Sequence, residues 1–277
     1  MPKRKVQPTG SAIKAATVAQ STKKQRRIKP ALELRLDAAR ALPLTKSGWS
    51  IHDAITHLVK CPHMKLIIEA HEIPNRLFPD DQTSDMNPYN IILKTIIYQQ
   101  VAGAAASSIL NKFIGALGVP SIDALTPEIV DAAIFSVVFV EGKKKIHVNG
   151  ATSGLSEPKM KYIRSLTEHF LDPAKLKGFN FETANDADII TRLTAVKGLG
   201  LWSVHIFMIM QLHRPNVLAT GDLAVRRSIC QAYGLPPKAL EGGKKGELEA
   251  ARVCAHWSPY ATVGCLYMWN VANITTA

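Results

Sequence analysis

The sequence has only four cysteines in 277 residues, at positions 61, 230, 254 and 265. No two of them are close enough along the chain to form a C-x-x-C pair, and the spacing of a metal site is absent. A disulfide-rich secreted fold is therefore excluded, and reduced, mostly buried thiols in an intracellular protein are favoured. We expect neither a metal nor another cofactor.

Long hydrophobic runs and strand patterns are also missing. No uninterrupted apolar run reaches the roughly 18 residues that a membrane helix needs, and the N-terminus has no hydrophobic segment of the kind found in secretory signals. We therefore expect no membrane association. No stretch alternates apolar and polar residues with the β-branched enrichment typical of strands. The sequence thus predicts an all-α protein, with helical lobes and no β-rich domain before residue 50.

Acidic residues are absent from the first 30 positions, which hold nine lysines and arginines. The rest of the chain has 25 basic and 22 acidic residues, a net charge of +3. We interpret residues 1–30 as a disordered basic tail and residues 31–277 as one helical domain. Such a charge distribution favours a nucleic-acid partner. The basic clusters in residues 2–5 and 23–27 predict a nuclear localisation signal, with a mitochondrial transit peptide as the alternative.

Two glycines, Gly198 and Gly200, lie in a short turn between two apolar segments that span about residues 190–212. Glycine permits close backbone approach, and the N–H groups at the start of the second helix favour anions. Lys197 lies in the same turn. The pattern predicts a hairpin that binds phosphate, although a turn between two buried helices gives the same sequence.

A single acid, Asp222, follows a loop at residues 214–222 and precedes a helical pattern that ends near Gly234. A carboxylate at this position can cap the helix or act as a catalyst. An anion-binding hairpin followed by one carboxylate indicates chemistry on a polyanion.

The remaining elements are predicted from periodicity and turn residues. We expect helices over residues 52–71, 87–117, 126–138 and 260–272, another that Ser156 caps, and a loop over 79–85. Residues 141–152, with Lys143–Lys145 at the tip, resemble a loop insertion, either solvated or in contact with DNA. Gln99 and Gln100 are two amides within an apolar run, which helix packing alone does not explain.

Four motifs resemble those of the helix-hairpin-helix (HhH-GPD) DNA glycosylases, in the order of that superfamily. They are Ile96–Ala106 with its Gln-Gln pair, Gly154–Lys159, the hairpin Val196–Gly200 with the loop Gly221-Asp222-Leu223, and Trp257–Tyr260, which departs from the usual pattern at the next residue, Ala261. The resemblance is to the 3-methyladenine DNA glycosylase II family of eukaryotic or fungal type. It implies two helical lobes with the active site in the cleft between them.

The resemblance also implies roles for individual residues. Asp222 is the catalytic carboxylate, Gln100 fills the gap left by the flipped nucleotide, and Lys197, Gly198 and Gly200 bind DNA. Trp202 and Trp269 match tryptophans of the base pocket. Bifunctional relatives place a Schiff-base lysine where this chain has Trp202. The family commonly has arginine where this chain has Ala261.

These observations predict a monofunctional enzyme of base excision repair. It would act as a monomer on double-stranded DNA, excising alkylated purines such as 3-methyladenine and 7-methylguanine, and leave an abasic site. The alternative is a non-catalytic helix-hairpin-helix DNA-binding protein, which would have no need of Asp222, Trp269 or the Gln-Gln pair.

Overall fold

The computed structural model describes residues 29–74 and 87–275. The predicted basic tail up to residue 28 and the loop predicted at 79–85 lie outside the described residues. Within the described ranges, no helix is long and apolar enough to cross a membrane.

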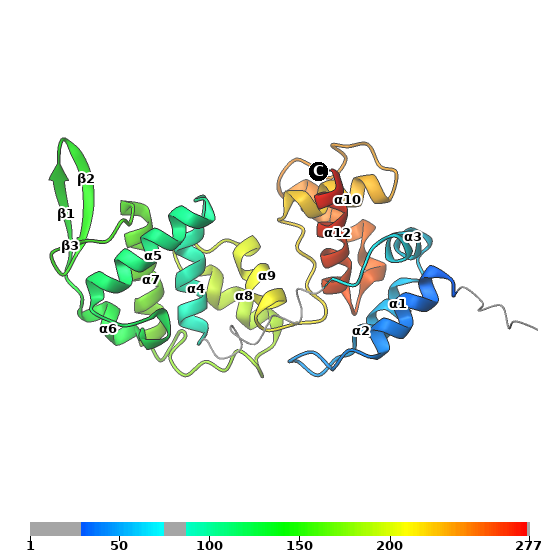
Figure 1. The fold of residues 1–277 in the computed structure, drawn as a ribbon, viewed down its shortest axis with the longest axis horizontal. Coiled ribbons are helices and arrows are strands. Elements are labelled where there is room, and N and C mark those ends of the chain that lie inside the picture. The colour runs from blue at the N-terminus through cyan, green and yellow to red at the C-terminus, as the bar shows by residue number, and fades with distance from the viewer. Residues whose placement is uncertain (1–28, 75–86, 276–277) are drawn as a thin grey trace, which may run out of the picture.

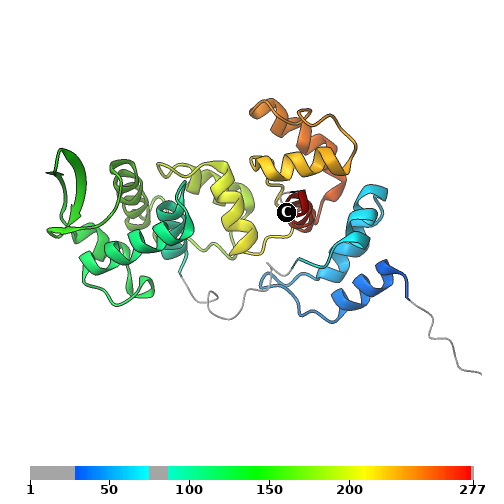
Figure 2. The ribbon, with the colours of Figure 1, turned by 45° about the horizontal axis from the view of Figure 1, so that its top comes forward.

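The described residues are mostly helical and form two lobes joined through residues 211–222 (Figure 1). The first lobe contains α4 (Pro88–Tyr98), α5 (Gly103–Leu117), α6 (Pro127–Ala132), α7 (Glu157–Leu171), α8 (Asp186–Thr194) and α9 (Leu201–Met210), with a short 3-10 helix at Ile122–Ala124. The second contains α1 (Ala31–Arg40), α2 (Ile51–Leu58), α3 (Pro62–Ala70), α10 (Leu223–Ala232), α11 (Lys244–Val253), the 3-10 helix Ala255–Trp257 and α12 (Ala261–Thr275). The first and last described helices therefore share one lobe, which Figure 2 shows beside the other.

The helices begin where the sequence supplies caps. Ser156 accepts a hydrogen bond from the backbone N–H of Lys159 at the start of α7, as predicted, and Asn185 caps α8 in the same way. Each such cap satisfies one of the free N–H groups of a first turn and contributes about 1 kcal/mol. The helix α12 is buried almost all round, from Ala261 to Trp269, and forms the centre of the second lobe.

A small sheet departs from the prediction of helix and loop over residues 126–152. The helix α6 ends at Ala132, and β1 (Phe135–Val140), β2 (Lys143–Val148) and β3 (Ala151–Thr152) form an antiparallel sheet in the order β1-β2-β3. Phe135 lies opposite Val148 and Val140 opposite Lys143. The prediction failed because most of β1 projects beyond the lobe and is exposed on both faces, so burial imposes no alternation on it.

The long helix predicted over residues 87–117 is in fact two helices. The helix α4 ends at Tyr98, Gln99 is extended, and Gln100 adopts a left-handed backbone conformation with φ of 55°. The break turns the chain at the Gln-Gln pair, and α5 starts afresh at Gly103.

Candidate active site

The break between α4 and α5 is held in place from two sides. Nζ of Lys159, a buried side chain, donates to the carbonyl of Ile97 at 2.6 Å, and burial lowers the pKa of this lysine. Nε2 of Gln99 donates to the carbonyl of Gly198 at 3.1 Å. The left-handed conformation of Gln100 is costly for a residue other than glycine, and such strain concentrates at functional sites. Gln100 therefore lies exposed in a fixed turn beside the hairpin.

The hairpin between α8 and α9 requires a glycine at position 198. Its φ is 87°, and a Cβ there would lie 2.3 Å from the ring of Tyr162. The backbone N–H of Lys197 donates to Oγ of Ser165 at 3.1 Å, so this amide is already used. In the described part of the chain, the amides of Gly198 and Gly200 have no acceptor, and no side chain caps α9. These N–H groups lie at the positive end of the helix dipole, an arrangement that favours an anion.

Asp222 both caps α10 and faces the hairpin unit. Its Oδ1 accepts from the backbone N–H of Val225 at 3.1 Å, and its Oδ2 accepts from Nε1 of Trp202 at 2.9 Å. The two readings of this acid in the sequence are therefore compatible, since capping occupies only one carboxylate oxygen. A carboxylate has about four acceptor positions, so two hydrogen bonds orient Asp222 and leave it able to accept more.

The segment that carries Asp222 is supported by α12. Oγ1 of Thr262 donates to the carbonyl of Arg214 at 2.5 Å and accepts from the N–H of Val217 at 3.1 Å. Sγ of Cys265 accepts from the N–H of Ala219 at 3.3 Å, and burial raises the pKa of this thiol to about 12. The loop is thus fixed on the central helix of the second lobe.

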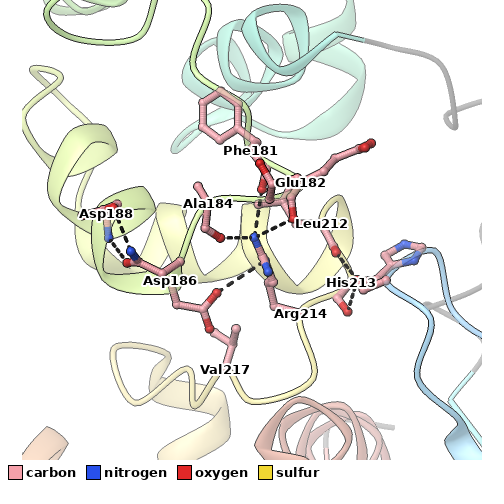
Figure 3. Close-up of polar contacts among 12 residues, drawn as sticks. Phe181, Glu182, Ala184, Asp186, Asp188, Leu212, His213, Arg214 and Val217 are labelled. Atoms are coloured by element: carbon pink, nitrogen blue, oxygen red, sulfur yellow. Dashed lines mark hydrogen bonds and ion pairs between the residues drawn. The ribbon is translucent and has the colours of Figure 1, made fainter.

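Arg214, at the start of this segment, ties it to the first lobe (Figure 3). Its Nη2 donates to the carbonyls of Phe181, Glu182 and Ala184 at 2.9, 3.2 and 2.6 Å, and its Nε lies 3.4 Å from Oδ1 of Asp186. A guanidinium can satisfy several acceptors because its donors are fixed in one plane. The side chain joins the approach to α8 with the loop that ends at Asp222.

The departure at Ala261 is accommodated by these contacts. Ala261 is buried, and its N–H donates to Oδ1 of Asn216 at 3.4 Å. At the far end of the loop, Nη1 of Arg226 donates to the carbonyl of Thr220. Arginines at positions 214 and 226 therefore brace both ends of the loop that carries Asp222.

An open depression of about 920 Å³ lies between the Gln100 turn and the hairpin. Its walls come from α4, the start of α7, the hairpin and the start of α9; they include Lys94, Tyr98, Gln99, Gln100, Lys159, Tyr162, Gly198 and Trp202. Trp202 is 45% exposed and is the link between this depression and Asp222. The arrangement places an aromatic face and amide side chains around one opening, with the Asp222 carboxylate hydrogen-bonded to the aromatic residue.

Most of the predicted site residues come together here. Gln100, Gly198 and Trp202 line the depression; Asp222 is bonded to Trp202, and Lys197 and Gly200 flank Gly198 in the hairpin. Trp269 is 8% exposed within α12 and is not among the residues that line the depression.

Several contacts that build the site could not be found from the sequence. Lys159, Ser165 and Arg214 act on backbone atoms that are between 30 and 62 residues away along the chain. Their partners are main-chain atoms, which have no residue signature. Gly198 was the available signal, because the absence of a Cβ leaves room for the Tyr162 ring.

The two lobes, the hairpin and the loop-borne carboxylate together define a class of DNA repair protein. Residues 93–255 match the HhH-GPD superfamily base excision DNA repair protein family. This match spans more than half of the chain, and the chain belongs to that family.

Individual relatives are between 24% and 28% identical to this chain. DNA-3-methyladenine glycosylase from Saccharomyces cerevisiae is 28% identical over 247 residues, covering 79% of this chain and 78% of that protein. DNA-3-methyladenine glycosylase 1 from Schizosaccharomyces pombe is 24% identical over 196 residues, covering 71% and 77%. The crystal structure of a DNA-3-methyladenine glycosidase from Bacillus halodurans superposes with a TM-score of 0.59 at 27% identity, covering 80% and 89%.

Proposed function

We propose that this chain is a monofunctional DNA glycosylase that flips alkylated purines out of duplex DNA and hydrolyses the bond to the sugar. The observation that carries the proposal is the Asp222 carboxylate, held by the start of α10 and by Trp202, which lines the depression. Membership of a base excision repair family supports the reaction class. The names of the relatives, all DNA-3-methyladenine glycosylases or glycosidases, support alkylated bases as substrates.

The proposed reaction breaks the bond between C1′ and the base nitrogen, whose electron pair leaves with the base. A base alkylated at N3 of adenine or N7 of guanine is cationic, so it departs as a neutral molecule. The sugar becomes an oxocarbenium ion, which an ionised carboxylate stabilises. Water then adds to C1′, and its proton passes to Asp222 or to solvent. The hydrogen bond from Trp202 orients the carboxylate for this role.

Access to C1′ requires the damaged nucleotide to leave the stack. We assign Gln100 as the side chain that enters the gap, because it is exposed at a fixed turn on the rim of the depression. The exposed indole of Trp202 offers a π-face to a cationic base. Trp269 stays a second pocket candidate on the family resemblance alone. Lys197 and the amides of Gly198 and Gly200 would bind the backbone phosphates on one side of the lesion.

We infer that the enzyme has no lyase activity. A lyase needs an amine that attacks C1′, and the matching position holds Trp202. Borohydride added during turnover should trap no protein–DNA adduct, and strands should break only after alkali treatment. An adduct that disappears in Lys197→Ala would contradict this assignment.

The substrate class is tested by incubating the purified protein with methylated duplex DNA and measuring released bases by chromatography. Release of 3-methyladenine and 7-methylguanine is expected. DNA binding without any release would favour the non-catalytic alternative.

We further infer a monomer that acts in the nucleus, with residues 1–30 as a basic tail and residues 31–277 as the enzymatic domain. Deleting residues 1–30 should weaken binding to undamaged DNA and reduce its salt dependence, because nine positive charges are removed. A reporter protein fused to residues 1–30 should accumulate in nuclei. Mitochondrial accumulation would contradict the assignment of compartment.

A further inference from the structure

The strands β1 and β2 form a basic hairpin, residues 135–148, that extends from the outer end of the first lobe. Figure 1 shows its tip pointing to the same upper side as the C-terminal end of α4, where the Gln100 turn lies. The turn at Glu141 and Gly142 has positive φ at both positions, 50° and 73°, which is the geometry of a tight two-residue hairpin. The tip is therefore a defined structure.

The base of the basic hairpin is fixed to the lobe. Asn149 exchanges hydrogen bonds with the backbone of Ile134, its Oδ1 accepting from the N–H of that residue at 2.9 Å. Its Nδ2 also donates to the carbonyl of Ala116 at 3.3 Å. Val148 is fully buried, and the ring of Phe135 packs near that of Phe113. An arm anchored in this way can carry charge at a set position relative to the rest of the protein.

Lys144 connects the arm to the start of α7, beside the depression. Its Nζ lies 3.4 Å from Oε2 of Glu157, the first residue of α7, and Glu157 also binds Lys161 at 2.8 Å. Ser156 and Pro158, the neighbours of Glu157, line the depression. The basic hairpin therefore stands next to the surface that contains Gln100 and the hairpin of Gly198.

The two other lysines of the arm project on the opposite face of β2 from Lys144. Lys143 and Lys145 are both exposed, alternate with Lys144 along the strand, and lie opposite Val140 and Val138. Among the described residues neither has an ion-pair partner. Phe139, opposite Lys144, is 68% exposed. A projecting tip with unpaired lysines on one face and an exposed aromatic ring on the other has the character of a contact surface for a polyanion.

We propose that the basic hairpin is a second DNA-contacting arm, in which Lys143 and Lys145 neutralise backbone phosphates of the duplex beyond the lesion. The proposal rests on the proposed function only in taking duplex DNA as the ligand. Duplex DNA is the expected ligand because its phosphates complement the positive charge of the arm, and because the arm adjoins the surface that contains the depression. The arm lengthens the footprint on one side without contacting the flipped base.

The test is the salt dependence of binding to undamaged duplex DNA. Lys143→Gln/Lys145→Gln should reduce the slope of log affinity against log salt by about 1.8, because each neutralised phosphate contributes about 0.9. The matched control is Lys175→Gln/Lys177→Gln, which removes the same charge from exposed positions after the far end of α7. This control should keep the parent slope, and Lys143→Arg/Lys145→Arg should keep it too.

A slope and affinity unchanged in Lys143→Gln/Lys145→Gln would overturn the proposal, as would an equal loss in the control. Folding is checked by the thermal melting curve, which exposed substitutions should leave unaltered. The result is separable from the proposed function, which is measured by base release from the parent protein. A parent that releases no base, together with a reduced slope in the variant, would reject the enzyme and keep the arm.

Discussion

The hydrogen bond between Trp202 and Asp222 provides a sharp test of the site. Replacing Trp202 by Phe keeps an aromatic wall and removes the Nε1–H donor that lies 2.9 Å from Oδ2. A hydrogen bond to a charged group is worth about 1.5–3 kcal/mol. Trp202 is 45% exposed, so solvent can partly replace the donor and the lower end of this range applies. Because the carboxylate acts on charge that develops in the transition state, the loss falls on the rate of base release.

A loss of about 1.4 kcal/mol slows the chemical step about tenfold. The assay is single-turnover release of 3-methyladenine from methylated duplex with enzyme in excess, which separates chemistry from product dissociation. Binding to a duplex that contains a stable abasic analogue should change little in Trp202→Phe.

Trp257→Phe is the matched control. Nε1 of Trp257 donates to the neutral hydroxyl of Tyr233 at 2.8 Å, at the other end of α10 from Asp222. This variant should lower the melting temperature and leave the single-turnover rate of the folded protein unchanged. If Trp202→Phe released base at the parent rate, the indole donor would have no part in orienting the carboxylate.

Three further variants test how the site is supported. Lys159→Met leaves the carbonyl of Ile97 without its donor, so it should lower the free energy of unfolding by about 1–3 kcal/mol and reduce base release. The control Lys161→Met breaks an exposed ion pair and should change the free energy of unfolding, measured in denaturant titrations, by no more than about 1 kcal/mol. Arg214→Met should lower the free energy of unfolding by about 3 kcal/mol, since three carbonyls lose a shared donor. Arg214→Lys should recover only part of this loss, because an ammonium cannot reach all three carbonyls. Equal stability of the parent and both variants would contradict the bracing role. Burial lowers the pKa of His213 below 6.5, so as the pH falls through 6.5 the unfolded chain binds the proton first and stability is lost. Asparagine suits the left-handed backbone at this position. Between about pH 7.5 and 5.5, the melting temperature should therefore fall less in His213→Asn than in the parent.

The helical elements and the residues of the hairpin could be predicted because their signals are local. Helix caps such as Ser156 and Asn185 determine where a helix begins through contacts within three residues, and Gly198 and Gly200 mark the turn in the same local way. The helical pattern that follows Asp222 placed this residue at a helix start, which the structure contains.

The sheet was missed although its turns had a sequence signal. Asn149-Gly150 adopts positive φ at both residues, as Asn-Gly turns in hairpins do. The two longer strands have no strand-like sequence pattern, because β1 is exposed on both faces and three successive lysines begin β2. A charged, projecting hairpin satisfies its backbone by pairing with itself, without the alternation that a buried face imposes.

The other features that the sequence did not predict depend on tertiary contacts. The break at Gln99 and Gln100 lies in an apolar run that reads as one helix, and it is stabilised by Lys159, about 60 residues further along the chain. The hydrogen bond from Trp202 to Asp222 joins residues 20 positions apart, and no local sequence pattern predicts it. The resemblance alone paired Trp269 with Trp202, and Trp269 does not line the depression.

The most direct test of the account is Asp222→Asn on methylated duplex DNA. Asn at this position still offers Oδ1 as an acceptor for the N–H of Val225, so α10 and the fold should persist. The account predicts parent-like DNA binding and melting temperature, with 3-methyladenine release nearly abolished. Release at the parent rate by a folded Asp222→Asn protein would contradict it.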